Sequence, residues 1–511
     1  MTDVLLGQAY YLRFDPKLWD ARQPYAPLGA LYAASCLRER GLSVALFDAM
    51  LAASESEWDA ALDRVRPKLA VLYEDSFNYL SKMCLLRMRQ AAFTMIDAAR
   101  ARGCPVVVAG SDATDHPDLY LARGALAVIA GEGEQTLTEL AAAVTRASRA
   151  PLESIHGLVF RRPDGSLART PARAFARDLD SLPLPAWDLV DVDRYRRIWR
   201  ERHGYFSMNA VTTRGCPYSC NWCARPVHGQ RYTSRSPEHV VSEIAWLKRT
   251  CAPDHVAFAD DIFGLKPGWI ERFAQLSVES GAVVPFKCLM RADLVDERVA
   301  PALRAAGCRT VWIGAESGSQ SVLDAMDKGL RVEQIERATR LLHAEGIEVG
   351  FFLQFGYPGE SREDIRKTIA MVRRCRPDDI GISVSYPLPG TKFYERVRAE
   401  LSAKQNWDDS ADLAMMYRGP YSTGFYRALH RVVHAEFRLR RALDELRRVA
   451  ARPARWRHRH VRLAASALAH ASTLPIARTR LARLERSERA GRQSSVMGDQ
   501  LSVVSRQSSV S

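Results

Sequence analysis

The chain has 511 residues, enough for two or three domains, and its 47% hydrophobic and 26% charged residues are ordinary values for a globular protein. The net charge of +14 is concentrated in residues 421–511, which hold 19 arginines, no lysine and six acidic residues. The rest of the chain is close to neutral, which argues against specific nucleic-acid binding by the body of the protein.

No targeting or membrane signal is evident in the sequence. The N-terminus lacks a basic stretch followed by a long apolar run, and no run of 18 apolar residues marks a membrane span. Ten cysteines in such a chain fit a reducing compartment. The sequence therefore predicts a cytoplasmic protein.

Short apolar runs alternate with helical patterns through residues 1–145. This alternation predicts an α/β domain with a doubly wound, Rossmann-like parallel sheet. Such sheets bind ligands at the carboxyl ends of their strands. The expected strands are residues 4–6, 44–47, 69–73, 106–109 and 127–130.

A connector is expected over residues 146–205. Residues 161–165 read as a turn between two short strands, and the two prolines within residues 182–187 forbid a regular helix. A second α/β domain then follows over residues 206–400. Six strand–helix units predict a partial (β/α)6 barrel, with strands at residues 209–213, 255–260, 284–289, 310–315, 347–355 and 380–385.

Three cysteines follow the first barrel strand directly. Cys216, Cys220 and Cys223 have the spacing C-x3-C-x2-C, in which one short loop can supply three thiolates to an iron–sulfur cluster and leave a fourth iron open. A zinc site would favour a second cysteine pair or histidines downstream, and the sequence offers none. Three buried core cysteines are the remaining alternative.

The cysteine loop, with Trp222 before its last cysteine, resembles the signature of the radical S-adenosylmethionine (radical SAM) enzymes. The resemblance implies that these cysteines bind a [4Fe–4S] cluster whose open iron chelates S-adenosylmethionine. It also implies reduction by flavodoxin or a ferredoxin, and cleavage of S-adenosylmethionine to a 5′-deoxyadenosyl radical.

Polar residues also follow the later barrel strands, where barrel enzymes carry their chemistry. The resemblance, which covers about residues 208–395, implies contact with S-adenosylmethionine or substrate. An arginine fork suits the carboxylate of S-adenosylmethionine, but Arg291 could equally form a structural ion pair with Asp293. The carboxylates could also cap helices. The candidates are Asp260, Asp261, Arg291, Glu316 and Ser317.

The N-terminal layout resembles the cobalamin-binding domain that precedes many radical SAM cores. The matching pieces are residues 27–29, the turn at 110–114 and residues 131–134, so the resemblance implies cobalamin near Gly110, Gly131, Glu132 and Gly133. The Asp-x-His-x-x-Gly motif that ligates cobalt is missing, which predicts an open lower face. The alternative is a domain of this topology that binds no corrinoid.

Beyond residue 400 the motif signal fades. Residues 401–488 are expected to form a helical basic extension, with an amphipathic helix over 425–450 and a basic run over 452–460. A solvated basic face is the simplest explanation, and weak contact with a membrane surface is the alternative. Residues 489–511 are rich in serine and are expected to be disordered.

Taken together, these patterns resemble the cobalamin-dependent radical SAM enzymes. The resemblance implies C-methyl transfer to an unactivated carbon of a small molecule, lipid or peptide. A non-methylating cyclase, rearrangement or oxidation enzyme would use the same residues. A non-enzymatic iron–sulfur protein would not explain the polar residues at the strand ends. The substrate itself cannot be predicted from these residues.

Overall fold

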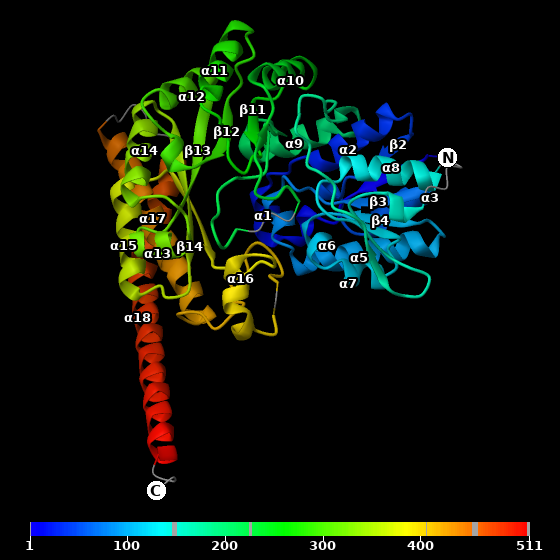
Figure 1. Cartoon of the computed structure of the whole chain (residues 1–511). Helices are drawn as coiled ribbons and strands as arrows, with labels where there is room; N and C mark the ends of the chain where they lie inside the picture. The colour runs from blue at the N-terminus through cyan, green and yellow to red at the C-terminus, as the bar shows by residue number, and fades with distance from the viewer. Residues whose placement is uncertain (1, 146–150, 224–226, 405, 452–457, 508–511) are drawn as a thin grey trace.

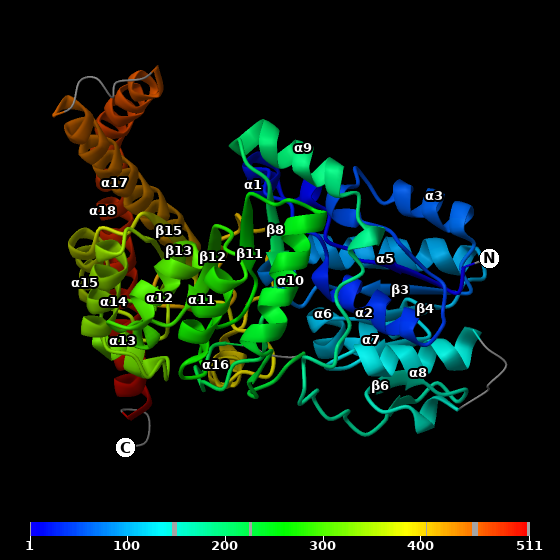
Figure 2. The ribbon, with the colours of Figure 1, turned by 90° about the horizontal axis from the view of Figure 1, so that it is seen from above.

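Two largely parallel sheets form the body of the protein, and a pair of long helices packs beside the second sheet (Figures 1 and 2). The computed structural model describes residues 2–145, 151–223, 227–404, 406–451 and 458–507. A single apolar core runs from the first strand through the second sheet to the last helix, so the domains are packed against one another. The predicted α/β fold class is confirmed.

The N-terminal sheet has the strand order β2-β1-β3-β4-β5, all parallel. Its central strands read as continuous aliphatic runs because both faces of the sheet are covered. Helices α2 and α8 cover one face, and α3 and α5 cover the other (Figure 2). Successive strands are added on one side of β1 up to β2 and on its other side from β3 onward, so the carboxyl ends of β1 and β3 form the switch point where ligands bind in such sheets. The strands are β1 (Val4–Gly7), β2 (Val44–Leu46), β3 (Leu69–Tyr73), β4 (Val106–Ala109) and β5 (Ala127–Ile129).

The helices of this domain complete its two outer layers. Helix α5 begins at Leu86, after Cys84, which adopts a left-handed φ of 54°. The helices are α1 (Pro16–Ala21), α2 (Leu28–Glu39), α3 (Ser56–Val65), α4 (Tyr79–Lys82), α5 (Leu86–Ala101), α6 (Ser111–Asp115), α7 (Pro117–Ala122) and α8 (Glu134–Thr145).

The connector extends the first sheet before it reaches the second. Strands β6 (Leu158–Arg161) and β7 (Leu167–Arg169) form an antiparallel hairpin that adds to β5, so the turn predicted at residues 161–165 is confirmed. Helix α9 (Val192–His203) then leads into the barrel.

The second sheet has six parallel strands in the order β15-β14-β13-β12-β11-β8 and remains open between its two edge strands. This is the predicted partial barrel. The strands are β8 (Ser207–Ala210), β11 (His255–Phe258), β12 (Phe286–Met290), β13 (Cys308–Glu316), β14 (Glu348–Phe355) and β15 (Asp379–Val384). The helices are α10 (Pro237–Thr250), α11 (Trp269–Glu279), α12 (Val299–Ala306), α13 (Gln320–Ala325), α14 (Val332–Ala344), α15 (Arg362–Cys375) and α16 (Lys392–Val397).

Residues 401–422 correct the expectation of a continuous helical extension. They form an irregular strap that ties the barrel to the N-terminal domain, because Asp, Ser, Gly and Pro within this stretch disfavour helix. Asn406 Nδ2 donates to the Cys84 carbonyl at 2.9 Å and to Tyr386 Oη at 2.8 Å. The backbone N–H of Ser410 donates to Asp15 Oδ2 at 3.0 Å.

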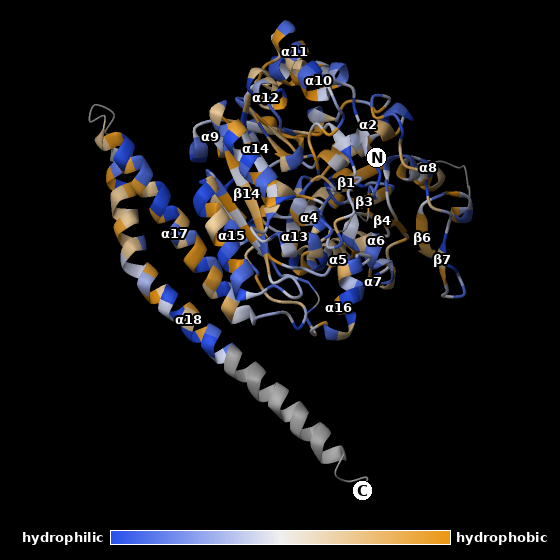
Figure 3. Cartoon of the chain, turned by 60° about the vertical axis from the view of Figure 1, so that its left-hand side comes forward, coloured by the Kyte–Doolittle hydropathy of each residue, from blue (hydrophilic) through white to orange (hydrophobic). Residues whose placement is uncertain are grey.

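The two C-terminal helices form a hairpin that extends beyond the body (Figure 3). Helix α17 (Thr423–Ala450) confirms the expected amphipathic helix, and α18 (His458–Gln507) packs along it. Buried side chains of α18 recur every seven residues, as expected for one face of a helix packed on another. They are His460, Ala467, Leu474 and Leu481.

The C-terminal end also differs from expectation. Residues 489–507 continue α18 as a helix, whereas disorder was expected; a helix that is already nucleated extends at little cost per residue. The basic run at 452–457 and residues 508–511 lie outside the described residues. Among the helices that are described, none is long and apolar enough to cross a membrane.

Candidate active site

The three-cysteine loop leaves the barrel at the carboxyl end of its first strand. Strand β9 (Thr213–Arg214) pairs antiparallel with β10 (Thr233–Ser234), so both ends of the loop are fixed. Gly215 has a φ of 76°, and a Cβ there would lie 2.0 Å from the Arg231 carbonyl oxygen. Only glycine can therefore connect the strand to the first cysteine.

All three cysteines of the loop are half-buried, and no disulfide joins any of the ten cysteines. In the described part of the chain, no three His, Cys, Asp or Glu residues form a group that could hold a single metal ion. A cluster spreads its three thiolates over three irons, so the three cysteines need not converge on one atom.

Asn221, between the second and third cysteines, anchors the loop with all of its polar groups. Its N–H donates to the Met326 carbonyl at 3.0 Å, and its Nδ2 donates to the Ala325 carbonyl at 2.8 Å. Its Oδ1 accepts from Tyr357 at 2.7 Å, and its carbonyl accepts from the Phe393 N–H at 2.9 Å. The barrel therefore fixes the backbone that carries the cysteines.

Arg291 also contacts the loop, through an aromatic ring. Its guanidinium lies 3.7 Å from the ring centroid of Tyr218, between the first two cysteines. Both sides of the guanidinium donate to Asp293, each at 3.0 Å. Of the two roles considered for Arg291, the structure shows the ion pair with Asp293. Burial disfavours its charge, but Asp293 more than offsets this, so the pKa of Arg291 is raised.

Glu316 ends the fourth barrel strand in an unusual conformation. Its φ is 54°, a left-handed value that non-glycine residues adopt at a cost. Its Oε1 accepts from Lys328 Nζ at 3.0 Å, and both side chains are nearly buried. Gly314 leaves the space for this pair, since a Cβ there would lie 2.7 Å from Glu316 Oε1 and 2.9 Å from Lys328 Nζ.

Asp260 and Ser317 form hydrogen bonds with other residues of the barrel. Asp260 is buried and accepts hydrogen bonds from the backbone N–H groups of Thr212 and Thr213, both at 2.7 Å. Burial raises the pKa of Asp260 to about 6, although these hydrogen bonds oppose the shift. Ser317 is also buried, and its hydroxyl lies 3.0 Å from that of Thr368 on α15. Contact of either residue with S-adenosylmethionine stays a prediction.

Asp261 faces the N-terminal domain. Lys82 at the end of α4 donates to Asp261 Oδ1 at 2.5 Å. Burial disfavours the charge on Lys82, but Asp261 and Cys223 outweigh it, so the pKa of Lys82 is raised. Tyr79, on the same helix, is 60% exposed. Helix α4 therefore reaches the barrel mouth beside the cysteine loop.

A second contact between the domains lies two residues before the first cysteine. Arg214 is buried, pairs with Glu132, and donates to Glu134 Oε1 at 2.7 Å. Glu132 lies in the loop after β5 and Glu134 begins α8, and both belong to residues 131–134, which the cobalamin resemblance singles out. Glu132 is therefore engaged in holding the two domains together, and its contact with cobalamin stays a prediction.

The glycines of the same edge make room for neighbouring side chains. A Cβ at Gly133 would lie 2.7 Å from Tyr73 Oη, and one at Gly110 would lie 2.5 Å from Glu74 Cβ. At Gly131 the nearest atom to such a Cβ is the Val227 carbonyl oxygen, at 3.8 Å. Gly110 and Gly133 thus serve packing, whereas Gly131 leaves open space in which a ligand could approach.

Unpaired polar groups lie at the carboxyl ends of β1 and β3. Both amide atoms of Gln8 and Oε2 of Glu74 are buried and have no hydrogen-bond partner in the structure. The other oxygen of Glu74 accepts from the Ala9 N–H at 2.8 Å. Burial raises the pKa of Glu74 to about 8. Unpaired buried groups are costly, so their position at the switch point indicates that a polar ligand pairs with them.

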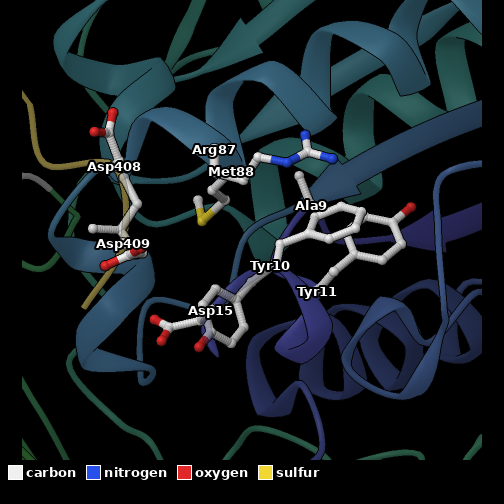
Figure 4. Close-up of a pocket in the computed structure, with 10 residues that line it drawn as sticks. Ala9, Tyr10, Tyr11, Asp15, Arg87, Met88, Asp408 and Asp409 are labelled. Atoms are coloured by element: carbon white, nitrogen blue, oxygen red, sulfur yellow. The ribbon is translucent and has the colours of Figure 1, made fainter. Parts of the chain in front are cut away.

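A small cavity lies next to this edge, at the end of β1 (Figure 4). Tyr10 and Asp15 line it from the N-terminal domain, and Asp408 and Asp409 from the strap face them. Its volume of about 10 Å³ is room for one water molecule. This cavity therefore cannot hold a substrate or a cofactor.

Several residues of the site were missed by sequence reasoning. Three of them contact partners that are 80 or more residues away in the sequence: Asn221, Lys82 and Arg214. The fourth, Lys328, lies only 12 residues from its partner Glu316. The position of Asn221 within the cysteine motif was a signal that could have been used. The contacts of Lys82 and Arg214 depend on how the two domains pack.

Comparison with known proteins agrees with this geometry. Residues 210–372 match the family model of the radical SAM superfamily. The chain is 27% identical to an uncharacterized methyltransferase, PH0819, of Pyrococcus horikoshii over 75% of this chain and 80% of that protein. It is also 27% identical to the anaerobic magnesium-protoporphyrin IX monomethyl ester cyclase of Rubrivivax gelatinosus, over 53% of this chain and 49% of the cyclase.

Among solved structures, the fold is similar to that of TsrM from Kitasatospora setae, a radical S-adenosylmethionine methyltransferase determined with cobalamin and a [4Fe–4S] cluster bound. The TM-score is 0.64 at 21% identity, over 78% of this chain and 75% of TsrM. The likeness covers both sheets, since the match exceeds the length of either domain alone.

Proposed function

We propose that the chain is a cobalamin-dependent radical SAM enzyme that transfers a methyl group to an unactivated carbon of a small molecule, lipid or peptide. One arrangement carries this proposal. The carboxyl edge of the N-terminal sheet is fixed against the cysteine loop, by Arg214 with Glu132 and Glu134 and by Lys82 with Asp261. Two cofactors bound at these edges would face each other across the domain boundary.

The residues present fit both cofactors. Three half-buried cysteines on an anchored loop suit a cluster, and Glu316 at the carboxyl end of β13 suits the polar end of S-adenosylmethionine. The unpaired amide of Gln8 and the acid of Glu74 suit the amide side chains of a corrinoid, which both donate and accept hydrogen bonds. We place the corrinoid at this edge.

The chain's own residues prepare the site for the reaction. When bound, the cluster supplies the electron that cleaves S-adenosylmethionine, and cobalamin supplies a methyl group. Asn221 and Arg291 hold the cysteine loop rigid, and Asp260 fixes the strand that leads into it. Helix α4 and the strap close the domain boundary, which limits access of water to a reactive radical.

We further propose that flavodoxin or a ferredoxin reduces the cluster.

The basic helical hairpin is better explained as a solvated face than as a membrane contact, because several of its arginines pair with acids. These pairs are Arg447 with Asp444, Arg448 with Glu445, and Arg478 with Glu436.

Product analysis tests the proposed reaction. Anaerobically reconstituted protein is incubated with reductant, cobalamin, S-adenosylmethionine and candidate substrates. Methyl transfer is expected to give methylated product with S-adenosylhomocysteine and 5′-deoxyadenosine, because one S-adenosylmethionine supplies the methyl group and another the radical. The similarity to the cyclase favours one alternative. A cyclase would give 5′-deoxyadenosine without S-adenosylhomocysteine, and that result would overturn the methyltransferase proposal.

A further inference from the structure

Residues 325–329, which are the end of α13 and the turn that follows it, hold the cysteine loop in place. Asn221 donates to the carbonyls of Ala325 and Met326. It also donates to Asp327 Oδ2 at 3.1 Å. Arg291, which lies against Tyr218 of the loop, donates to the carbonyls of Lys328 at 3.0 Å and Gly329 at 3.1 Å. Every one of these contacts ends on the turn, so the turn and the cysteine loop form one rigid unit.

The side chain of Lys328 points from this turn to Glu316. Its Nζ lies 3.0 Å from Oε1, and the pair is nearly buried. No described residue donates to the other oxygen, Oε2. The left-handed backbone of Glu316 restricts how its side chain can leave the strand. The contact with Lys328 therefore holds the Glu316 carboxylate in one orientation.

The turn that carries this ammonium lies beside a cluster ligand. Cys220 directly precedes Asn221, whose N–H donates to the Met326 carbonyl, two residues before Lys328. Arg291, which donates to the Lys328 carbonyl, adds a second positive charge beside the loop. Little water screens them, because both side chains are nearly buried. A fixed positive charge stabilises the more negative, reduced form of a nearby cluster, and so raises its reduction potential.

We propose that Lys328 is the positioning residue that couples the cluster to S-adenosylmethionine. Its turn fixes the cysteine loop, its ammonium orients Glu316 toward S-adenosylmethionine, and its charge favours reduction of the cluster. This inference rests on the proposed function, because it needs a cluster and S-adenosylmethionine at the site. It adds a residue that belongs to neither the cysteine motif nor the strand-end candidates.

The test compares two variants with a matched control, all reconstituted anaerobically. Lys328→Met removes the charge and the hydrogen bond, whereas Lys328→Arg keeps the charge. Lys287→Met is the control, because Lys287 is a half-buried lysine on the neighbouring strand β12, away from the turn. Iron content, the midpoint potential of the cluster and the Kd for S-adenosylmethionine are measured for each.

With normal iron content, Lys328→Met should show a more negative midpoint potential and at least about tenfold weaker binding of S-adenosylmethionine, the loss expected for a buried charge-assisted contact. Lys328→Arg should restore the potential more fully than the affinity, because its fork does not reproduce the ammonium geometry. Lys287→Met should match the wild type. An unchanged potential together with an unchanged affinity in Lys328→Met would overturn the proposal.

A second variant keeps the test decisive if Lys328→Met does not hold a cluster. Gly314→Ala leaves both charged groups in place but inserts a methyl group 2.7–2.9 Å from their contacting atoms. Binding of S-adenosylmethionine should weaken while the potential stays near the wild-type value. Unchanged affinity in this variant would refute the role of Lys328 in orienting Glu316. A wild-type protein that takes up no cluster would instead contradict the proposed function itself.

Discussion

The two sheets meet at their carboxyl edges, but the two edges are built differently. At the barrel mouth, three polar side chains have partners within the chain: Asn221 uses all its groups, Asp260 accepts from two threonines, and Glu316 binds Lys328. Trp222 Nε1, in the cysteine loop, is the exception among the side chains named here, since it is buried without a partner. At the N-terminal edge, Gln8 and Glu74 are buried with unpaired atoms.

The difference indicates which edge depends on a ligand. The barrel mouth positions its cluster loop by contacts that exist without any cofactor. The N-terminal edge leaves buried donors and acceptors unsatisfied, which is costly unless a ligand supplies the missing hydrogen bonds. We therefore expect changes at the barrel mouth to affect cofactor chemistry, and changes at the N-terminal edge to affect stability and corrinoid uptake.

The largest effect should come from the cluster ligands. Changing Cys216, Cys220 and Cys223 together to alanine removes every thiolate of the loop and should abolish cluster binding. Iron and sulfide analysis after anaerobic reconstitution measures this. Changing the buried Cys104, Cys251 and Cys308 to alanine is the control for loss of cysteines alone. Full iron content in the first variant would mean that the cluster is held elsewhere.

The contact between the two edges should be the next most sensitive point. Arg214→Met removes the positive charge that pairs with both Glu132 and Glu134. Breaking a buried ion pair in this way lowers the free energy of unfolding by about 3–5 kcal/mol. Thermal unfolding should show a clearly lower Tm. Arg231→Met, at an exposed arginine of the same loop, is the control. Equal Tm values for the two variants would show that the domains do not depend on this pair.

The sequence allowed much of the barrel mouth to be predicted, because its residues follow strands with clear patterns. The six strands, the cysteine loop and the position of Glu316 were all expected. The partners of these residues were not, since Asn221 meets residues 325–327 and Arg214 meets Glu132 only through packing of distant segments. Gln8 and Glu74 gave no signal, because an unpaired buried group can be recognised only when its surroundings are known.

A smaller, pH-dependent effect is expected at Glu74. Burial raises its pKa to about 8, above the ordinary value of 4.5, so between these values the folded state binds a proton that the unfolded state has lost. The stability that comes from this proton is therefore lost as the pH rises toward 8. Glu74→Gln mimics the protonated acid, so its advantage in unfolding free energy over the wild type should grow with pH, on the order of a few kcal/mol.

Thermal unfolding of both proteins at pH 5.5, 6.5 and 7.5 measures this difference. Glu363→Gln, at an exposed position on α15, is the control and should show no such trend. A constant difference between Glu74→Gln and the wild type across this range would show that Glu74 does not titrate there.

The smallest effect is expected at the end of the chain. Truncation after Ala490 removes the far end of α18, which follows the contact between Glu488 and the Ser422 N–H. Cluster content, cleavage of S-adenosylmethionine and Tm should all stay at the wild-type level. A large fall in Tm would show that the removed segment packs against the body.

The central claim is that a corrinoid binds at the N-terminal edge without a histidine below the cobalt. Protein expressed with cobalamin and purified anaerobically should hold about one corrinoid per chain, and Gln8→Ala should hold much less. The electron paramagnetic resonance spectrum of the Co(II) form should show no nitrogen superhyperfine splitting from an axial ligand. Protein without corrinoid would contradict the claim, as would a splitting that disappears in His228→Ala, because His228 is buried beside this edge and lies 3.1 Å from Ser76 Oγ.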